Sequence, residues 1–356
     1  MLTSVLADST ESRLTAIMDE MPLYRSEFTG TFANHAPMVL VALAAMGGSK
    51  ARLRDFFDRY NADHALLPPT EHVGLITHEN LDEFLGERER ESDYARFFEG
   101  EVDRLGIEGA LAAYLPRFSD GVAASALHGL MRAAYAVLRA DRTETVHALA
   151  YWAATYLPLA PSKGAAPVTD DPAEVLKRVA ALPALRSQPI QEMLWHNMLA
   201  VSQEPSFAPV VDWLALGPDA DARLASASLA LFTATQDFCA LHALTGAHWV
   251  RIVAPYTPQP DLLRRHFWQA VAALMPKMEF PAVPPAETLE EWRRLPMPDW
   301  PEITAAACQS YDEHDISVVF SAREQHSVYG DPLHKLAAAR RMGLVADYTV
   351  HGMAPA

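Results

Sequence analysis

The sequence has few cysteines and no long apolar segment, and each shortage excludes a class of protein. Only Cys239 and Cys308 occur. They are too few for a disulfide framework and lack the paired spacing of a zinc or redox motif, so we expect two buried thiols. No apolar run is long enough to span a bilayer, and residues 1–13 lack the basic start and hydrophobic segment of a signal peptide. These absences predict a cytoplasmic protein that is not embedded in a membrane.

Basic residues are also in short supply. Acidic residues outnumber basic residues by 45 to 29, which gives a formal net charge of -16. Nucleic acids and anionic membrane surfaces are negatively charged, so this balance argues against both as partners. No Gly-x-Gly-x-x-Gly motif follows a strand pattern, and Gly47 and Gly48 are typical of a helix end. We therefore expect no dinucleotide-binding domain.

The sequence does contain helical periodicity along most of its length. Half of the 356 residues are hydrophobic, enough for one large helical domain or two packed helical lobes. Apolar residues recur at intervals of three and four, and no run alternates as a strand does, which predicts an all-α, bundle-like fold with long irregular loops. We expect an N-terminal helical half (1–156), a proline-rich linker (157–172) and a C-terminal helical half (173–356) that form one compact unit.

Helix boundaries follow from caps, prolines and glycines. Irregular stretches rich in proline, glycine or charge are expected at 61–86 and 276–301. The helices are expected at 34–46, 51–60, from about 92 onward, 119–139, 143–156, 173–182, 189–201, 221–253 with a break near Thr245 and Gly246, 261–274, 304–326 and 332–344.

Five of the 14 histidines lie on apolar faces of these predicted helices: His35, His128, His242, His248 and His314. The last is grouped with Tyr311 and Val318. Two of them, His242 and His248, are six residues apart, so they share a face only if their helix is distorted. Each histidine alone is typical of a core side chain that is hydrogen-bonded to a carbonyl or carboxylate.

The five together indicate a metal site. Imidazole nitrogen is a good ligand for iron, zinc, copper and nickel, and helical folds build such sites from ligands on different helices. We expect the site to lie between the two halves of the chain. No His-Glu-x-x-His or Glu-x-x-His signature is present. The pattern therefore leaves a metal site and structural histidines equally open.

Several short segments, in this order, resemble the questin oxidase-like family: 32–38, 44–48, 125–130, 241–248 and 311–316. The resemblance extends from about residue 28 to about residue 345. It implies an oxidoreductase of aromatic polyketide metabolism that inserts oxygen into, or oxidatively cleaves, anthraquinone-type rings. It also implies a non-haem iron bound by several histidines and, in some members, by a carboxylated lysine.

The family pattern falls on the same five histidines, but its lysine, three residues after the last histidine, falls on Ser317. A neutral serine hydroxyl replaces an anionic ligand poorly. The position is then left to water, substrate or a carboxylate such as Asp312, Glu313 or Asp315, or the site selects another divalent metal. A shifted register would equally explain the serine.

The leading hypothesis is an iron-dependent mono- or dioxygenase that uses O₂ on a small aromatic or polyketide substrate, with NADPH as reductant by resemblance only. Asn34 and Thr245 are candidates to orient ligands, while Tyr311, Trp249 and Phe32 are candidate pocket walls, although packing or capping explains each as well. Catalytic residues and the oligomeric state are left open. The alternatives are a zinc-type hydrolase or lyase, and a non-enzymatic helical ligand-binding protein with structural histidines.

Overall fold

The computed structural model describes residues 4–345, and it confirms the predicted all-α fold. The described residues contain 15 α-helices, short 3₁₀ turns and one two-stranded hairpin. They divide into two compact units. Unit 1 comprises residues 4–161 and 249–270, and unit 2 comprises residues 162–248 and 271–345. The last residues of the predicted C-terminal half, 346–356, lie outside the described part.

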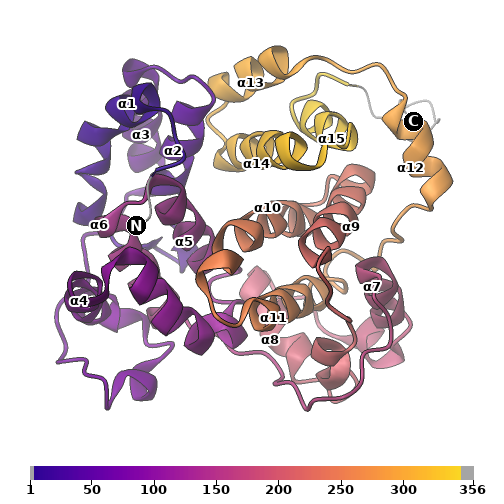
Figure 1. The fold of residues 1–356 in the computed structure, drawn as a ribbon, viewed down its shortest axis with the longest axis horizontal. Coiled ribbons are helices and arrows are strands. Elements are labelled where there is room, and N and C mark those ends of the chain that lie inside the picture. Colours follow the sequence, from indigo (N-terminus) through magenta and orange to yellow (C-terminus); the bar gives the residue numbers. More distant parts are fainter. Residues whose placement is uncertain (1–3, 346–356) are drawn as a thin grey trace. The chain divides into compact units, whose positions relative to one another are not determined.

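Unit 1 holds the first six helices and the hairpin. The long helix α4 and the helix α5 both pack against α6, and α2 packs against α1, α3 and α5 (Figure 1). Its elements are α1 (Asp8–Met18), η1 (Met21–Leu23), β1 (Glu27–Phe28), β2 (Phe32–Ala33), α2 (Ala36–Ala45), α3 (Lys50–His64), η2 (Leu81–Phe84), η3 (Arg88–Arg90), α4 (Glu91–Phe118), η4 (Ser119–Gly121), α5 (His128–Arg139), α6 (Arg142–Ala154), η7 (Ala254–Tyr256) and most of α11 (Pro260–Ala273).

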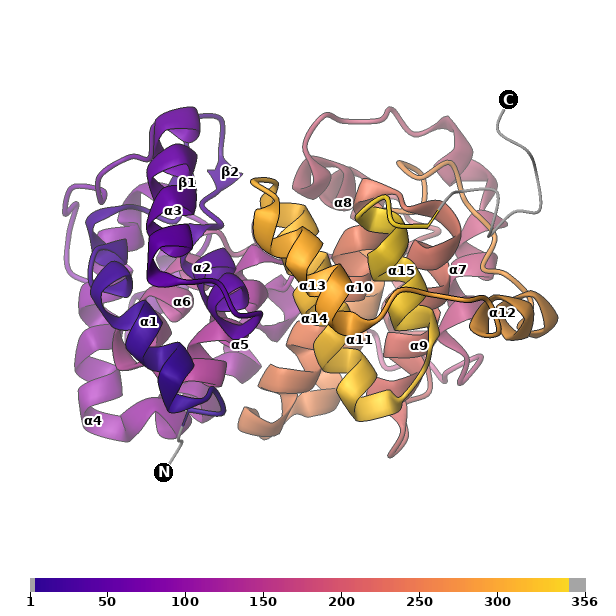
Figure 2. The same ribbon diagram turned by 90° about the horizontal axis from the view of Figure 1, so that it is seen from above.

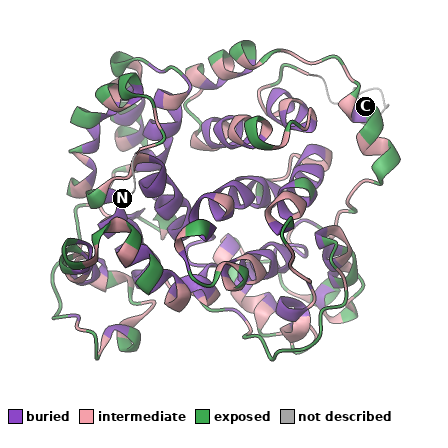
Figure 3. Ribbon diagram, viewed as in Figure 1, coloured by how far each residue is buried: buried purple, intermediate pink, exposed green. Residues whose placement is uncertain are grey.

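The core of unit 1 is built on α2, α5 and α6, which are buried along almost their whole length (Figure 3). Helices α5 and α6 approach closely because Gly129 has no side chain. A Cβ atom there would lie 2.9 Å from the Trp152 ring and 3.1 Å from the Trp152 Cα. Ala140, in a left-handed conformation, ends α5, and the Asp141 carboxylate caps α6 by accepting from the Glu144 amide. The expected helix end at 139 is therefore confirmed, and the next helix begins at Arg142, one residue before the expected start at 143.

Unit 2 holds the other helices apart from α11, most of which lies in unit 1. Helix α14 packs against α13 and α15, and α15 also packs against α9 and α12 (Figure 1). Its elements are α7 (Pro172–Ala180), η5 (Pro183–Ser187), α8 (Leu194–Ser202), η6 (Ala208–Asp212), α9 (Ala220–Thr235), the greater part of α10 (Phe238–Val253), α12 (Ala286–Arg293), α13 (Trp300–Gln309), α14 (Glu313–Tyr329) and α15 (Leu333–Arg341).

Three predicted helices are wrong in ways that concern the histidines. The helix expected at 119–139 becomes α-helical only at His128. The helix expected at 221–253 breaks between α9 and α10, where Gln236 is left-handed, and runs without a break through Gly246. The helix expected at 304–326 is interrupted after Gln309, because the Asp312 carboxylate caps a new helix there.

Other expectations need smaller corrections. The hairpin β1–β2, which Figure 2 shows beside α3, and the helix α12 were not predicted from the sequence. Cys239 is buried as expected, whereas Cys308 is only half-buried. Among residues 4–345, no helix combines the length and the apolar character needed to cross a membrane.

Candidate metal centre

His35 and His128 meet inside unit 1. Their Nε2 atoms lie 2.8 Å apart, and the two rings are nearly perpendicular, with centroids separated by 4.6 Å. Both residues are buried, at 7% and 6% exposure. The structure thus brings together two of the predicted site histidines, which are 93 residues apart in the sequence.

The tautomers of both rings follow from their other nitrogens. His35 Nδ1 lies 2.9 Å from the Ala33 carbonyl oxygen, and His128 Nδ1 contacts the Ser125 carbonyl oxygen. A carbonyl only accepts hydrogen bonds, so each Nδ1 carries the hydrogen. In neutral imidazoles the Nε2 atoms then present lone pairs to each other. Two facing lone pairs at this distance repel unless a cation or a proton is held by both nitrogens.

The separation of the two nitrogens fits a shared metal ion. Two nitrogen ligands at about 2.1 Å from one ion stand roughly 3.0 Å apart at a right angle and roughly 3.4 Å apart at a tetrahedral angle. The observed 2.8 Å is nearer to the first value. Ligating histidines commonly donate their other ring N–H to a backbone carbonyl, as both do here. A proton shared between the rings is the competing explanation of the contact.

His35 is positioned by the turn that leads from β2 into α2. The Asn34 side chain accepts from the Ala36 amide at 3.1 Å and donates to the Arg25 carbonyl at 3.2 Å. The backbone N–H of His35 donates to the Tyr60 hydroxyl at 3.0 Å. Asn34, which we expected near the ligands, therefore fixes the backbone on either side of His35.

His128 is positioned differently from the prediction. It was expected on an apolar face in the middle of the helix predicted at 119–139, but it is the first residue of α5. The three preceding residues, Ser125, Ala126 and Leu127, have φ angles of 42°, 56° and 74°. This left-handed turn places the Ser125 carbonyl against the His128 ring.

In unit 2, the imidazole rings of His242 and His314 both contact the ring of Phe238. The two imidazole centroids are 6.2 Å apart, and each lies 4.9 Å from the Phe238 ring. His242 is buried, and its Nδ1 donates to the Phe238 carbonyl oxygen at 2.8 Å. Phe238 precedes His242 by one helical turn, and this spacing is the sequence signal that indicates the contact.

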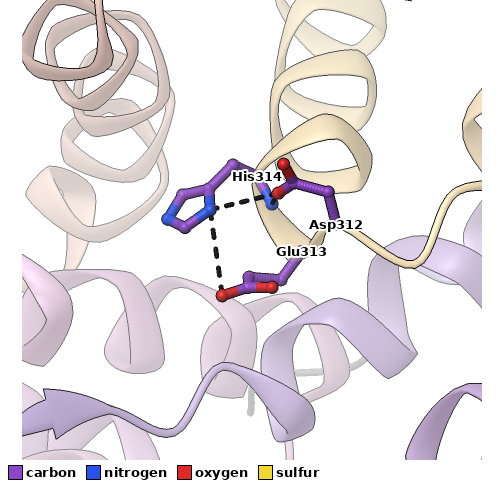
Figure 4. A group of neighbouring side chains, drawn as sticks. All are labelled: Asp312, Glu313 and His314. Carbon is purple, nitrogen blue, oxygen red and sulfur yellow. Dashed lines mark hydrogen bonds and ion pairs between the residues drawn. The ribbon is translucent and has the colours of Figure 1, made fainter. Parts of the chain in front are cut away.

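The Nδ1 atom of His314 faces two carboxylates (Figure 4). Its Nδ1 lies 3.2 Å from Asp312 Oδ1 and 3.8 Å from Glu313 Oε1. The hydrogen bond from His314 lowers the pKa of Asp312 to about 2. Ligand atoms of these three residues lie within 4.8 Å of one another, a spacing that a metal ion can bridge. Asp312 is exposed and also pairs with Arg341 at 3.0 Å, so this group is equally explained as a solvated ion pair.

His248 faces another part of unit 2. It is fully buried, and its Nδ1 lies 3.1 Å from Ser321 Oγ. Because α10 is continuous, His242 and His248 are separated by about 240° around the helix. The distortion that would place both on one face is not present. Thr245 donates to the Leu241 carbonyl of its own helix at 3.0 Å.

The other predicted positions have varied surroundings. Ser317 is buried one turn after His314, and its hydroxyl makes no hydrogen bond to any residue in 4–345. Trp249 is buried at 2% exposure, whereas Tyr311 and Phe32 are exposed at 38% and 47%. Sequence reasoning missed Glu27 and Tyr60, which contact the two turns that carry His35 and His128.

The comparisons with known proteins agree with the motifs. The family model described as questin oxidase-like matches residues 32–321 of this chain. This range contains all five predicted site histidines and Ser317. No curated protein matches the chain.

Proposed function

The chain belongs to the questin oxidase-like family, and from this premise we propose that it is a metal-dependent oxygenase of aromatic polyketide substrates. The family indicates an oxidoreductase, an oxidase that acts on polyketides. The metal, the use of dioxygen and the aromatic character of the substrate are our proposal.

The contact between His35 and His128 carries this proposal. Two buried imidazoles that turn their lone pairs toward each other are the arrangement that a metal ion requires of its ligands. Protein side chains alone do not activate dioxygen, and a bound ferrous ion supplies that chemistry. A monooxygenase reaction also consumes two electrons from a reductant, for which NADPH is the candidate that the family resemblance implies.

The residues around His35 support a flat aromatic substrate. Phe28 stacks on Phe32 at 5.8 Å and on His64 at 4.7 Å, and His64 lies 4.3 Å from the Tyr60 ring. Tyr60 in turn accepts the His35 backbone N–H. Aromatic rings therefore continue from the half-exposed Phe32 to the neighbourhood of His35. Such surfaces bind planar rings by stacking and by excluding water.

The prediction that all five histidines and a replacement for the family's lysine join in one centre stays a prediction. Within unit 2, His242 is the histidine most comparable with the pair. It is buried, and the Phe238 carbonyl accepts the hydrogen of its Nδ1, so its Nε2 also carries the lone pair.

Metal analysis of the full chain tests the proposal. We expect anaerobically purified protein, reconstituted with Fe²⁺ and desalted, to retain stoichiometric iron and to consume O₂ when a hydroxylated anthraquinone is added. His128→Ala should lose the iron. His266→Ala is the matched control, because His266 is as buried in unit 1 but pairs with Gln269 at 2.9 Å. Wild-type protein that retains neither Fe²⁺ nor another divalent metal would contradict the proposal, and zinc retention without O₂ consumption would favour a hydrolase or lyase.

A further inference from the structure

The turn before His128 has an uncommon backbone. Ser125, Ala126 and Leu127 are consecutive residues with positive φ, and none of them is glycine. Residues with a Cβ atom rarely adopt this conformation, and they keep it only where surrounding contacts hold it. The contacts that hold this turn therefore also decide where the His128 ring lies.

The side chain of Ser125 is held from two sides. Ser125 Oγ donates to Glu27 Oε1 at 2.7 Å and accepts from the Tyr151 hydroxyl at 2.8 Å. Glu27 is buried at 4% exposure, and its other oxygen accepts from Arg88 Nε at 2.8 Å. The Ser125 carbonyl accepts the hydrogen of His128 Nδ1. One residue thus connects a buried carboxylate, through its side chain, to the imidazole, through its backbone.

Glu27 is also paired with the residue whose carbonyl holds the His35 ring. In the hairpin, Glu27 of β1 pairs with Ala33 of β2. The Ala33 carbonyl accepts the hydrogen of His35 Nδ1. Glu27 is therefore linked to one imidazole by the register of the hairpin and to the other by its carboxylate.

A second buried contact ties the same elements together. Arg132, one turn after His128 on α5, donates to Ser26 Oγ at 2.6 Å and pairs with Glu144 of α6 at 3.1 Å. Ser26 precedes Glu27 and also donates to Glu91. The chain is thus held on both sides of His128: Ser125, before it, contacts Glu27 of β1, and Arg132, after it, contacts Ser26, the residue before β1. Of these two contacts, the one made by Glu27 is the one to the turn itself.

We propose that Glu27 and Ser125 are positioning residues for the metal pair: the hydrogen bond between them holds the left-handed turn so that His128 Nε2 meets His35 Nε2. The inference rests on the proposed metal centre. Partners of this kind, which orient a ligand without touching the ion, commonly change metal affinity when they are replaced.

The test uses Co²⁺ as the probe, because its visible spectrum reports both affinity and ligand geometry. We expect Glu27→Gln and Ser125→Ala to bind Co²⁺ about 10- to 100-fold more weakly than wild type, with a changed spectrum. Glu101→Gln is the matched control. Glu101 is equally buried in unit 1 and accepts from Tyr114 at 2.7 Å, but it has no contact with either histidine turn. Its Co²⁺ affinity and spectrum should match those of wild type.

Ser125→Gly separates positioning from folding. Glycine adopts positive φ without strain, so this variant should melt close to wild type while it loses the hydroxyl that Glu27 holds. We expect weakened Co²⁺ binding in Ser125→Gly as in Ser125→Ala. Wild-type affinity and spectrum in Ser125→Gly and Glu27→Gln would overturn this inference alone, whereas wild-type protein that binds no Co²⁺ would overturn the proposed function.

Discussion

The same sequence pattern indicated the candidate histidines of unit 1 and those of unit 2, but their surroundings in the structure differ. His35 and His128 are both buried, each donates to a backbone carbonyl, and their Nε2 atoms face each other at 2.8 Å. His314 is half-buried beside two carboxylates, and His248 contacts a serine hydroxyl. His242 of unit 2 also donates its Nδ1 hydrogen to a carbonyl, but among residues 4–345 no second imidazole faces its ring as His35 faces His128. A position on an apolar face of a predicted helix therefore does not by itself indicate whether an imidazole meets a second ligand.

The largest expected effect concerns the ion pair that fixes α5. Arg132 and Glu144 are buried at 2% and 7% side-chain exposure. Burial alone would raise the pKa of Glu144, but the Arg132 guanidinium, together with His147 and Arg139, outweighs burial and lowers this pKa. Glu144→Ala leaves the Arg132 charge buried without this carboxylate, so we expect a loss of about 3–5 kcal/mol in the free energy of unfolding, measured by urea denaturation.

Glu174→Ala on α7 is the control in unit 2, because Glu174 forms a partly exposed pair with Arg178. Its cost should stay below about 1 kcal/mol. Equal losses of unfolding free energy in the two variants would contradict this prediction, because the buried ion pair of unit 1 would then stabilise the protein no more than the exposed pair of unit 2.

The second prediction compares the loss of Co²⁺ affinity when a candidate ligand is removed from each unit. We expect His35→Ala to lower Co²⁺ affinity by on the order of 100-fold, because one imidazole contributes a large share of the binding free energy of such a site. His314→Ala should lower it less, since Asp312 and Glu313 already hold His314 through hydrogen bonds or ion pairs. Isothermal titration of both variants measures the difference. A larger loss in His314→Ala would reverse the ranking of the two regions.

A third prediction concerns a buried histidine away from the candidate centre. Burial lowers the pKa of His334 to about 4, although the neighbouring Asp331 opposes this and His326 adds to it. The unfolded chain then binds more protons than the folded one between about pH 4 and 6.5, so stability is full above this window and falls as the pH drops through it.

We expect His334→Asn, whose amide can still donate to the Asp331 carbonyl, to lose about 1–2 kcal/mol less between pH 7 and pH 5 than wild type does. Urea melts at the two pH values measure this change. An unchanged pH dependence would show that His334 does not titrate as a core histidine.

The smallest effect concerns the aromatic rings beside His35. Phe28→Ala removes stacking with Phe32 and His64. We expect affinity for 1,8-dihydroxyanthraquinone, measured by fluorescence quenching, to fall about threefold to tenfold, the value of one aromatic contact. Metal content should not change. Phe97→Ala, which removes an edge-to-face contact with His78 elsewhere in unit 1, should leave the affinity unaltered.

The sequence predicted the fold class and family correctly, and it placed His35 and His128 among the candidates. It missed the turn at Ser125, because alanine and leucine favour a helix locally and the contact with Glu27 spans 98 residues. Other errors had a visible signal in the sequence. Aspartate is a preferred helix N-cap, so Asp312 indicates a helix that starts beside His314, as α14 does. The prolines around 276–301 concealed α12.

The central claim is that the His35–His128 pair holds a metal ion. Anomalous scattering at the iron absorption edge, from crystals grown anaerobically with Fe²⁺, tests it most directly. We predict an iron peak within bonding distance of both Nε2 atoms. A peak only beside Asp312 and Glu313, or a hydrogen-bonded His35–His128 pair without any peak, would contradict the claim.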